Sequence, residues 1–259
     1  MAGDDILFSA SVDGVAVMTI NRPEKYNAMT VEMLDETLPD ICRRVEEDDA
    51  IRVLVITGSG KAFCTGADVG SRLAELSDEV LLRPLGGYAI PFARIRKPVV
   101  AAINGVTAGG GLGLALLADL RIASDAARFT TAFVRRGLTA DTGVSVTLPR
   151  LVGVEKALHL LMTAEMIDAT EALRIGMVGR VVPHDRLMDE VLEYARLIAA
   201  GPPIAQAFAK EAVYAGLHRS FEEQLPFESW QQSICLKTQD FAEGRAAFLE
   251  KRAPTFRGR

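Results

Sequence analysis

The chain has 259 residues, of which 49% are hydrophobic and 24% charged, and its formal net charge is -5 at pH 7. This length and apolar content predict one large folded domain with at most a small appendage, and they exclude disorder as the main state. The acidic balance gives no general attraction to a phosphate backbone, so nucleic acid is not expected as a partner.

The three cysteines, Cys42, Cys64 and Cys235, are far apart in the sequence and lie in no CxxC or His/Cys cluster. The pattern predicts neither a disulfide framework nor a metal site, and it favours a reducing, cytoplasmic location. The first residues lack a basic region followed by a long apolar run, so no secretory signal is expected.

In chain order, residues 6–20 predict two short strands around the Asp13-Gly14 turn. Thr30 is a candidate N-cap for a helix over 31–48. A buried strand is predicted over 51–58, then a glycine-containing loop, and an irregular helical stretch over 71–96.

Residues 98–120 are apolar enough to resemble a membrane span, but they begin with Pro98 and contain a Gly-Gly-Gly run. We interpret them as a buried strand over 98–103, a loop and a helix over 111–120, with no membrane as partner. Short strands are predicted at 121–124 and 128–130, and helices at 154–164 and 168–178, the latter capped by Asp168. Alternating strands and helices predict an α/β core with a mostly parallel sheet, and the residues after 185 predict helices broken at 201–203.

Two glycine-bearing turns follow buried strands, Cys64–Asp68 and Gly109–Gly111. Free N–H groups at such turns can converge on one oxygen atom, and a helix N-terminus adds partial positive charge. Two such donors would form an oxyanion hole. Close packing of helix against strand also needs glycine, and these residues alone do not separate the two interpretations.

Four segments carry a resemblance to a known family: NRPEKYNAM, VLVITGSGKAFCTGADV, KPVVAAINGVTAGGGLGLALLADLRIAS and LPRLVG. Together they resemble the crotonase (enoyl-CoA hydratase/isomerase) superfamily over nearly the whole chain. The resemblance implies a ClpP/crotonase-like ββα spiral core over residues 1–200 and a C-terminal helical oligomerisation region over 201–259. It also implies a homotrimer or dimer of trimers, an acyl-CoA thioester as substrate, and no cofactor beyond coenzyme A as part of that substrate.

By motif position, the resemblance assigns the two oxyanion N–H groups to Ala67 and Gly110. The sequence departs from the hydratases of the family at both catalytic glutamates, because Gly113 and Phe133 stand at those positions. No glutamate occurs between Glu79 and Glu155, so an ordinary hydratase is disfavoured.

Asp141 stands eight residues after Phe133, at the position of the acid in some other members. This part of the chain looks most like 1,2-epoxyphenylacetyl-CoA isomerase and Δ3,Δ2-enoyl-CoA isomerases. We therefore expect an acyl-CoA isomerase in which Asp141, buried beside Phe133, moves a proton in an enoyl thioester. Asp141 could instead cap a helix starting at Thr142, and one residue can do both.

The resemblance also implies substrate contacts. The candidates for coenzyme A and substrate binding are Arg22, Lys25, Ala28, Cys64, Gly66, Asp68, Phe133 and Lys251, the last from a neighbouring subunit. Apolar residues of the stretch 70–95, Tyr88 among them, imply an apolar or aromatic acyl group.

Three other functions remain open. They are a hydratase with non-standard acids, an acyl-CoA hydrolase or dehalogenase with Asp141 as nucleophile, and an inactive acyl-CoA-binding homologue. An RNA-binding relative is discounted because the seven lysines are never clustered.

Overall fold

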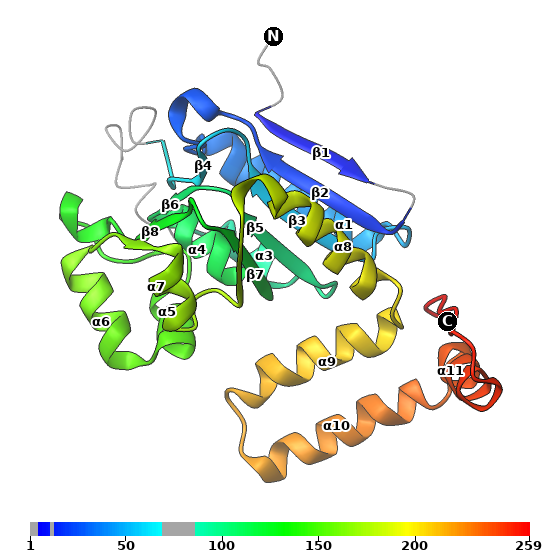
Figure 1. Ribbon diagram of the computed structural model, residues 1–259. Coiled ribbons are helices and arrows are strands. Elements are labelled where there is room, and N and C mark those ends of the chain that lie inside the picture. Colours follow the sequence, from blue (N-terminus) through cyan, green and yellow to red (C-terminus); the bar gives the residue numbers. More distant parts are fainter. Residues whose placement is uncertain (1–4, 11–12, 69–85) are drawn as a thin grey trace.

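The structure is a computed structural model that describes residues 5–10, 13–68 and 86–259. Its main sheet has six strands in the order β1-β2-β3-β5-β7-β10 (Figure 1). These strands are β1 (Ile6–Ala10), β2 (Val15–Ile20), β3 (Val53–Gly58), β5 (Val99–Ile103), β7 (Leu120–Ser124) and β10 (Arg180–Val182). Only the β1–β2 pair is antiparallel, which confirms both the predicted hairpin and the mostly parallel sheet.

A second sheet of four short strands has the order β4-β6-β8-β9. Its members are β4 (Ala62–Cys64), β6 (Val106–Ala108), β8 (Arg128–Thr130) and β9 (Ile167–Asp168). Three successive turns of the chain each contribute a strand to the main sheet and then one to the second sheet. This repetition is the crotonase spiral expected from the resemblance. Of these four strands, only β8 was predicted.

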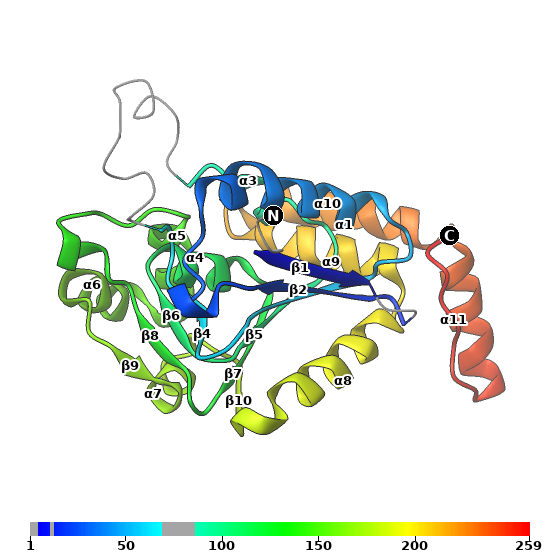
Figure 2. The same ribbon diagram turned by 90° about the horizontal axis from the view of Figure 1, so that it is seen from above.

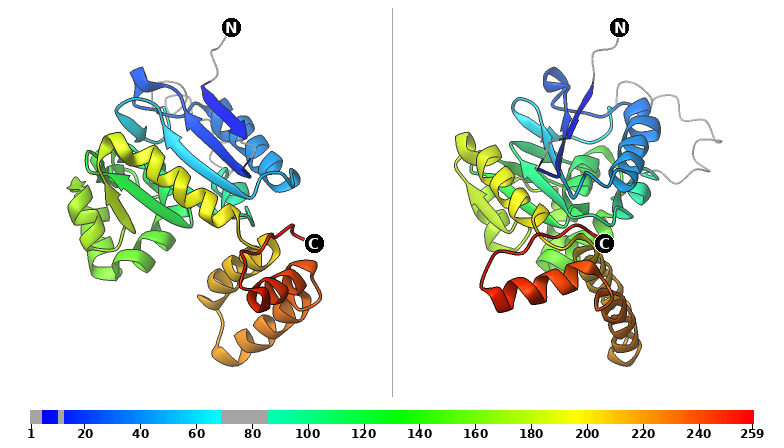
Figure 3. Two further views of the ribbon diagram at one scale, coloured as in Figure 1. Left: turned by 45° about the vertical axis from the view of Figure 1, so that its right-hand side comes forward. Right: turned by 90° about the vertical axis from the view of Figure 1, so that its right-hand side faces the viewer.

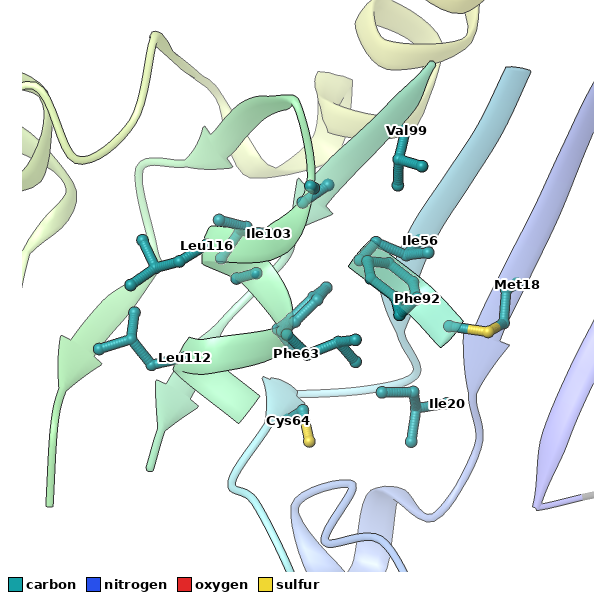
Figure 4. Close-up of a cluster of buried hydrophobic side chains, with 14 of the residues drawn as sticks. Met18, Ile20, Ile56, Phe63, Cys64, Phe92, Val99, Ile103, Leu112 and Leu116 are labelled. Atoms are coloured by element: carbon teal, nitrogen blue, oxygen red, sulfur yellow. The ribbon is translucent and has the colours of Figure 1, made fainter. Parts of the chain in front are cut away.

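Helices cover both faces of the main sheet. Helix α8 (Leu187–Ala199) lies along one face, where Val191, Ala195 and Ala199 pack against valines of β3 and β5 (Figure 1). The other face is covered by α1 (Leu38–Glu47), α3 (Ala89–Ala93) and α4 (Gly110–Leu117). Figure 4 shows the core between these helices and the main sheet, with Phe63 and Phe92 at its centre. The central strands β3 and β5 are therefore buried on both faces, as expected for parallel strands.

The helices predicted over 31–48, 154–164 and 168–178 are present with different ends, whereas α5 was not predicted as an element. Thr30 Oγ1 accepts a hydrogen bond from Met33 N (3.2 Å), as predicted, although a π-helical turn (Met33–Thr37) precedes α1. Asp168 Oδ1 accepts from Glu171 N (2.8 Å) and caps the helix α7 (Ala169–Arg174). Two further helices precede α7, namely α5 (Val144–Val152) and α6 (Val154–Thr163).

The C-terminal helices α9 (Pro203–Gly216), α10 (Phe221–Cys235) and α11 (Gln239–Glu250) project away from the two sheets (Figure 3). Between them they bury only Gln231, Asp240 and Ala247. Helix α9 is held to the core through Asp119, which accepts from Lys210 Nζ (2.7 Å) and Tyr214 Oη (3.0 Å). In a single copy of the chain, α9, α10 and α11 therefore leave a large apolar surface exposed.

Candidate active site

The first candidate oxyanion donor lies in the turn after β4. Gly66 has φ +92°, a conformation that L-residues rarely adopt, so glycine is required there. Its carbonyl accepts from Met29 N (2.8 Å), and Asp68 N donates to Met29 O (2.9 Å). Because these two bonds flank Ala67 in a parallel bridge, the N–H of Ala67 itself points away from Met29.

The second candidate donor is at the start of α4. Gly109 has φ +52°, and Gly110 is the first residue of the helix, so its N–H has no carbonyl partner within the helix. A Cβ on Gly111 would collide with the carbonyl of Cys64, which fixes helix α4 close against β4. Close packing, the alternative role of these glycines, is therefore also present.

The two turns meet. A Cβ built on Gly66 would lie 3.0 Å from Gly110 N, so the turns that carry Ala67 and Gly110 are in direct contact. Within the described part of the chain, neither Ala67 N nor Gly110 N donates a hydrogen bond. Two unused peptide donors on touching turns can bind one oxygen atom that gains negative charge.

The loop 22–28 lies beside the Ala67 turn. Arg22 donates through Nη1 to Ala28 O and to Asp68 Oδ2 (3.1 Å), which ties this loop to the residue after Ala67. Asn27, which the sequence interpretation did not single out, is fully buried and donates to Ala62 O (2.7 Å) at the base of β4. The sequence shows that Asn27 lies in the NRPEKYNAM segment but not that it is buried, so it gave no signal for this role.

The candidate cationic side chains differ in their exposure, their ion pairing and their place in the fold. Arg22 is mostly enclosed and ion-paired with Asp68, whereas Lys25 is exposed on a short 3-10 turn. Lys251 is the left-handed residue that ends α11, and in one chain this helix lies far from β4 (Figure 2). The structure thus brings Arg22 and Lys25 together and leaves Lys251 apart from them.

At Gly113, the position of the first glutamate in the hydratases of the family, there is no room for a side chain. A Cβ on Gly113 would lie 2.6 Å from Thr142 Cβ and 2.7 Å from Thr142 Cγ2, far inside van der Waals contact. Thr142 is buried and has φ +54°, an unusual conformation for a β-branched residue. The second hydratase position is occupied by Phe133, whose buried ring approaches to 4.0 Å of a Cβ built on Gly109.

Asp141 is placed next to Thr142 but not as expected in detail. It is exposed rather than buried beside Phe133, and its Oδ1 accepts a hydrogen bond from Thr142 Oγ1 (2.8 Å). Helix α5 begins at Val144, not at Thr142, and only the main-chain carbonyl of Asp141 bonds to Val144 N (3.0 Å). The alternative role of Asp141, a side-chain N-cap, is therefore not found in the structure.

Tyr88 joins the same cluster. Its hydroxyl lies 2.8 Å from Thr142 Oγ1, and it would be 2.9 Å from a Cβ on Gly110. Burial raises the pKa of Tyr88, so its phenol is neutral at physiological pH. Residues 70–85, where most of the expected acyl pocket falls, lie outside the described residues.

Other chemistries find no support in the described residues. Burial raises the pKa of Cys64 to about 12, so this thiol is a poor nucleophile. No group of three or more His, Cys, Asp or Glu side chains in those ranges could hold a metal ion. None of the described helices is long and apolar enough to cross a membrane.

Comparison with known proteins places the chain in a class. The family model for enoyl-CoA hydratase/isomerase matches residues 11–259, and the chain belongs to this family, within the crotonase superfamily. A protein named "probable enoyl-CoA hydratase" from Rhodobacter capsulatus is 41% identical over 95% of this chain and 96% of that protein. The 1,2-epoxyphenylacetyl-CoA isomerase of Escherichia coli is 34% identical over 98% of this chain and 99% of that protein.

A solved structure gives the same result for the fold. The enoyl-CoA hydratase from Bacillus anthracis superimposes with a TM-score of 0.93 at 34% identity, covering 98% of this chain and 100% of that one. The chain is therefore an enzyme of the enoyl-CoA hydratase/isomerase family. Relatives carry both hydratase and isomerase names, so the type of reaction has to be argued from the site.

Proposed function

We propose that this protein is an acyl-CoA isomerase that shifts a double bond in an enoyl-CoA thioester, with Asp141 as its single acid and base. The observation that carries the proposal is the closed space at Gly113, where Thr142 occupies the position from which a glutamate would start. Phe133 supplies no acid at the second position. Hydration needs groups for both a water molecule and a carbon-bound proton, whereas a 1,3-proton shift needs only one.

In the proposed reaction, Asp141 removes the α-proton of a β,γ-unsaturated acyl thioester. The electron pair moves into the thioester carbonyl, whose oxygen accepts from Ala67 N–H and Gly110 N–H. Each such donor contributes about 2.7–4 kcal/mol to stabilising the charge that develops on an oxyanion. Protonated Asp141 then returns the proton at the γ-carbon, which leaves the α,β double bond, neutral thioester and ionised Asp141.

The remaining candidate residues surround this centre. Cys64, Gly66 and Phe133 shape the oxyanion turns, and Ala28 and Asp68 are joined to them through Arg22. We assign coenzyme A phosphates to Lys25 and Arg22, together with Lys251 from a second copy of the chain. This last assignment requires the homotrimer or dimer of trimers, for which the exposed apolar surface of α9–α11 is the support.

The test is turnover of a β,γ-enoyl-CoA in deuterated water by the wild type and by Asp141→Asn. The wild type is expected to conjugate the double bond. Asp141→Asn is expected to lose about 10²-fold or more in kcat, the size of a general acid–base contribution. Full activity of Asp141→Asn would contradict the proposal. Crotonyl-CoA run on the same two proteins is the control for hydration.

A hydratase is the second candidate because relatives such as the Rhodobacter capsulatus protein carry that name. Hydration of crotonyl-CoA that disappears in Asp141→Asn would favour it over the isomerase. A covalent acyl-Asp141 adduct seen by mass spectrometry would favour a hydrolase or dehalogenase. Tight acyl-CoA binding without turnover across a panel of thioesters would favour a binding-only homologue.

A further inference from the structure

A chain of two hydroxyl groups ends on the Asp141 carboxylate. Thr142 Oγ1 donates to Asp141 Oδ1 at 2.8 Å, and the Tyr88 hydroxyl lies 2.8 Å from the same Oγ1. A threonine hydroxyl has a single hydrogen atom, which here is given to the carboxylate. Tyr88 must therefore be the donor to Thr142, and both O–H bonds are directed toward Asp141.

The two linked hydroxyl groups lie over the first turn of α4. A Cβ on Gly110 would lie 2.9 Å from the Tyr88 hydroxyl and 3.4 Å from Thr142 Oγ1, so both hydroxyls rest against the residue that offers the oxyanion N–H. The acid and the oxyanion turn are thus joined by side chains from two separate parts of the chain, Tyr88 and Asp141–Thr142, which meet at Gly110.

Thr142 is held in this place at a conformational cost. Its φ of +54° is strained for a β-branched residue, and strain of this kind persists only where the surroundings fix it. Gly86 and Gly113 leave the space for it, since a Cβ on Gly86 would be 3.0 Å from Thr142 N and one on Gly113 would overlap its side chain. The chain of hydroxyls depends on this enforced position.

We propose that Tyr88 is a positioning residue, which acts through Thr142 to orient Asp141 and to favour its ionised form. The inference rests on the proposed role of Asp141 as the acid and base. A hydrogen bond donated to an ionised carboxylate is stronger than one donated to a neutral carboxylic acid, and the bond from Tyr88 polarises the Thr142 O–H that makes it. Tyr88 itself does not touch the reacting atoms.

Removal of the Tyr88 hydroxyl has a defined sign. Thr142 then lacks its donor, the hydrogen bond to Asp141 weakens, and the ionised carboxylate loses stabilisation. Among the described residues, the titratable groups that face the Tyr88 hydroxyl are Asp141 and Cys64. Burial raises the pKa of Cys64 to about 12, so this thiol stays neutral at acidic pH and does not titrate there.

The experiment compares kcat/KM against pH for wild type, Tyr88→Phe, Thr142→Val and Thr142→Ser. In Tyr88→Phe and Thr142→Val, the acid limb is expected to move up by roughly half to one pH unit, and kcat is expected to fall roughly 3- to 10-fold with KM little changed. Thr142→Ser keeps the hydroxyl and is expected to restore the wild-type limb. In the double variant Tyr88→Phe/Thr142→Val, the acid limb is expected to move no further than in either single variant. Both substitutions break the same chain of hydrogen bonds.

Tyr214→Phe is the matched control. Like Tyr88→Phe it removes one tyrosine hydroxyl, here that of Tyr214 on α9, which donates to Asp119 between α4 and β7, outside the candidate site. It is expected to lower the melting temperature without moving the acid limb. If Tyr214→Phe moves the limb as much as Tyr88→Phe does, the positioning role of Tyr88 is wrong.

A second measurement separates this inference from the isomerase proposal. The carboxyl carbon of Asp141, assigned in carbon-13 NMR by its loss in Asp141→Asn, is titrated in wild type and Tyr88→Phe. An upward shift of its midpoint in Tyr88→Phe supports the hydroxyl chain even if no isomerase activity is found. An unchanged midpoint overturns the inference, even if Asp141→Asn abolishes isomerisation.

Discussion

At the scale of single residues, Gly113 and Thr142 decide what the site can contain. The sequence shows that Gly113 has no side chain, but only the structure shows that its space is already taken. Asp141 could be located from its motif, yet its exposure and its hydroxyl partner could not. The hydroxyl of Thr142 that donates to Asp141 is itself bonded to Tyr88, which is 54 positions away in the sequence.

The closed space gives a stability prediction. Gly113→Ala would place a Cβ 2.6 Å from Thr142 Cβ, and overpacking of this kind lowers the free energy of unfolding by about 1–3 kcal/mol. In a Thr142→Gly background the same substitution is expected to cost clearly less, because the blocking side chain is gone. Unfolding in urea measures both effects.

Gly179→Ala is the control for Gly113→Ala. Its Cβ would lie 3.7 Å from Arg121 O, which is ordinary contact, and the residue does not have a positive φ. We expect a change within about 0.5 kcal/mol. Equal losses for the two alanine variants, or an unchanged loss in the Thr142→Gly background, would show that Thr142 does not close the space at Gly113.

At the scale of elements, the pattern of the sequence located the long, buried strands and most helices. Strands β3 and β5 are continuous apolar runs, and such runs predict buried parallel strands reliably. Strands β4 and β6 have three residues each and lie in glycine-rich loops, so no periodicity could show them. Their pairing partners come from other turns of the spiral, which is tertiary information.

Two side chains of helix α9 donate to one carboxylate of the core, that of Asp119. Asp119 accepts from Val99 N (2.8 Å), Lys210 Nζ and Tyr214 Oη, and the Lys210–Asp119 pair is only 13% and 16% exposed. Asp119→Ala would leave the largely buried Lys210 charge unpaired. We expect a loss of about 3 kcal/mol in unfolding free energy and faster proteolysis near residues 201–203.

Asp40→Ala is the matched control for this substitution. The Asp40–Arg43 pair is also a short ion pair, but its side chains are 71% and 62% exposed. An exposed pair of this kind contributes little, so we expect a change within about 0.5 kcal/mol. If Asp119→Ala is as mild as Asp40→Ala, then α9 is attached mainly by other contacts.

At the scale of the whole molecule, the three C-terminal helices expose several large apolar side chains. Phe221, Phe248 and Leu249 are 76%, 82% and 69% exposed. The sequence predicted a helical appendage but not the direction in which it extends. Figure 3 shows that the helices leave the core, so few of their apolar residues can be covered within one copy.

We therefore expect the protein to sediment as a trimer or a dimer of trimers in analytical ultracentrifugation. Phe248→Asp is expected to lower the assembled mass, because a charge on this exposed apolar position opposes its burial. Arg196→Asp, on the exposed side of α8 in a pair with Asp13, is the control for an added charge. A monomeric wild type, or an assembly insensitive to Phe248→Asp, would contradict this prediction.

The interlock of Thr142 with Gly113 also constrains the order in which this site could be converted to another chemistry. A glutamate cannot enter at Gly113 while the Cβ of residue 142 lies 2.6 Å from its own Cβ, so Thr142 has to become glycine first. That first step removes the hydroxyl that bridges Tyr88 to Asp141. A stepwise route from this site toward one with a glutamate would thus pass through an enzyme whose existing acid has lost its support before the new one arrives.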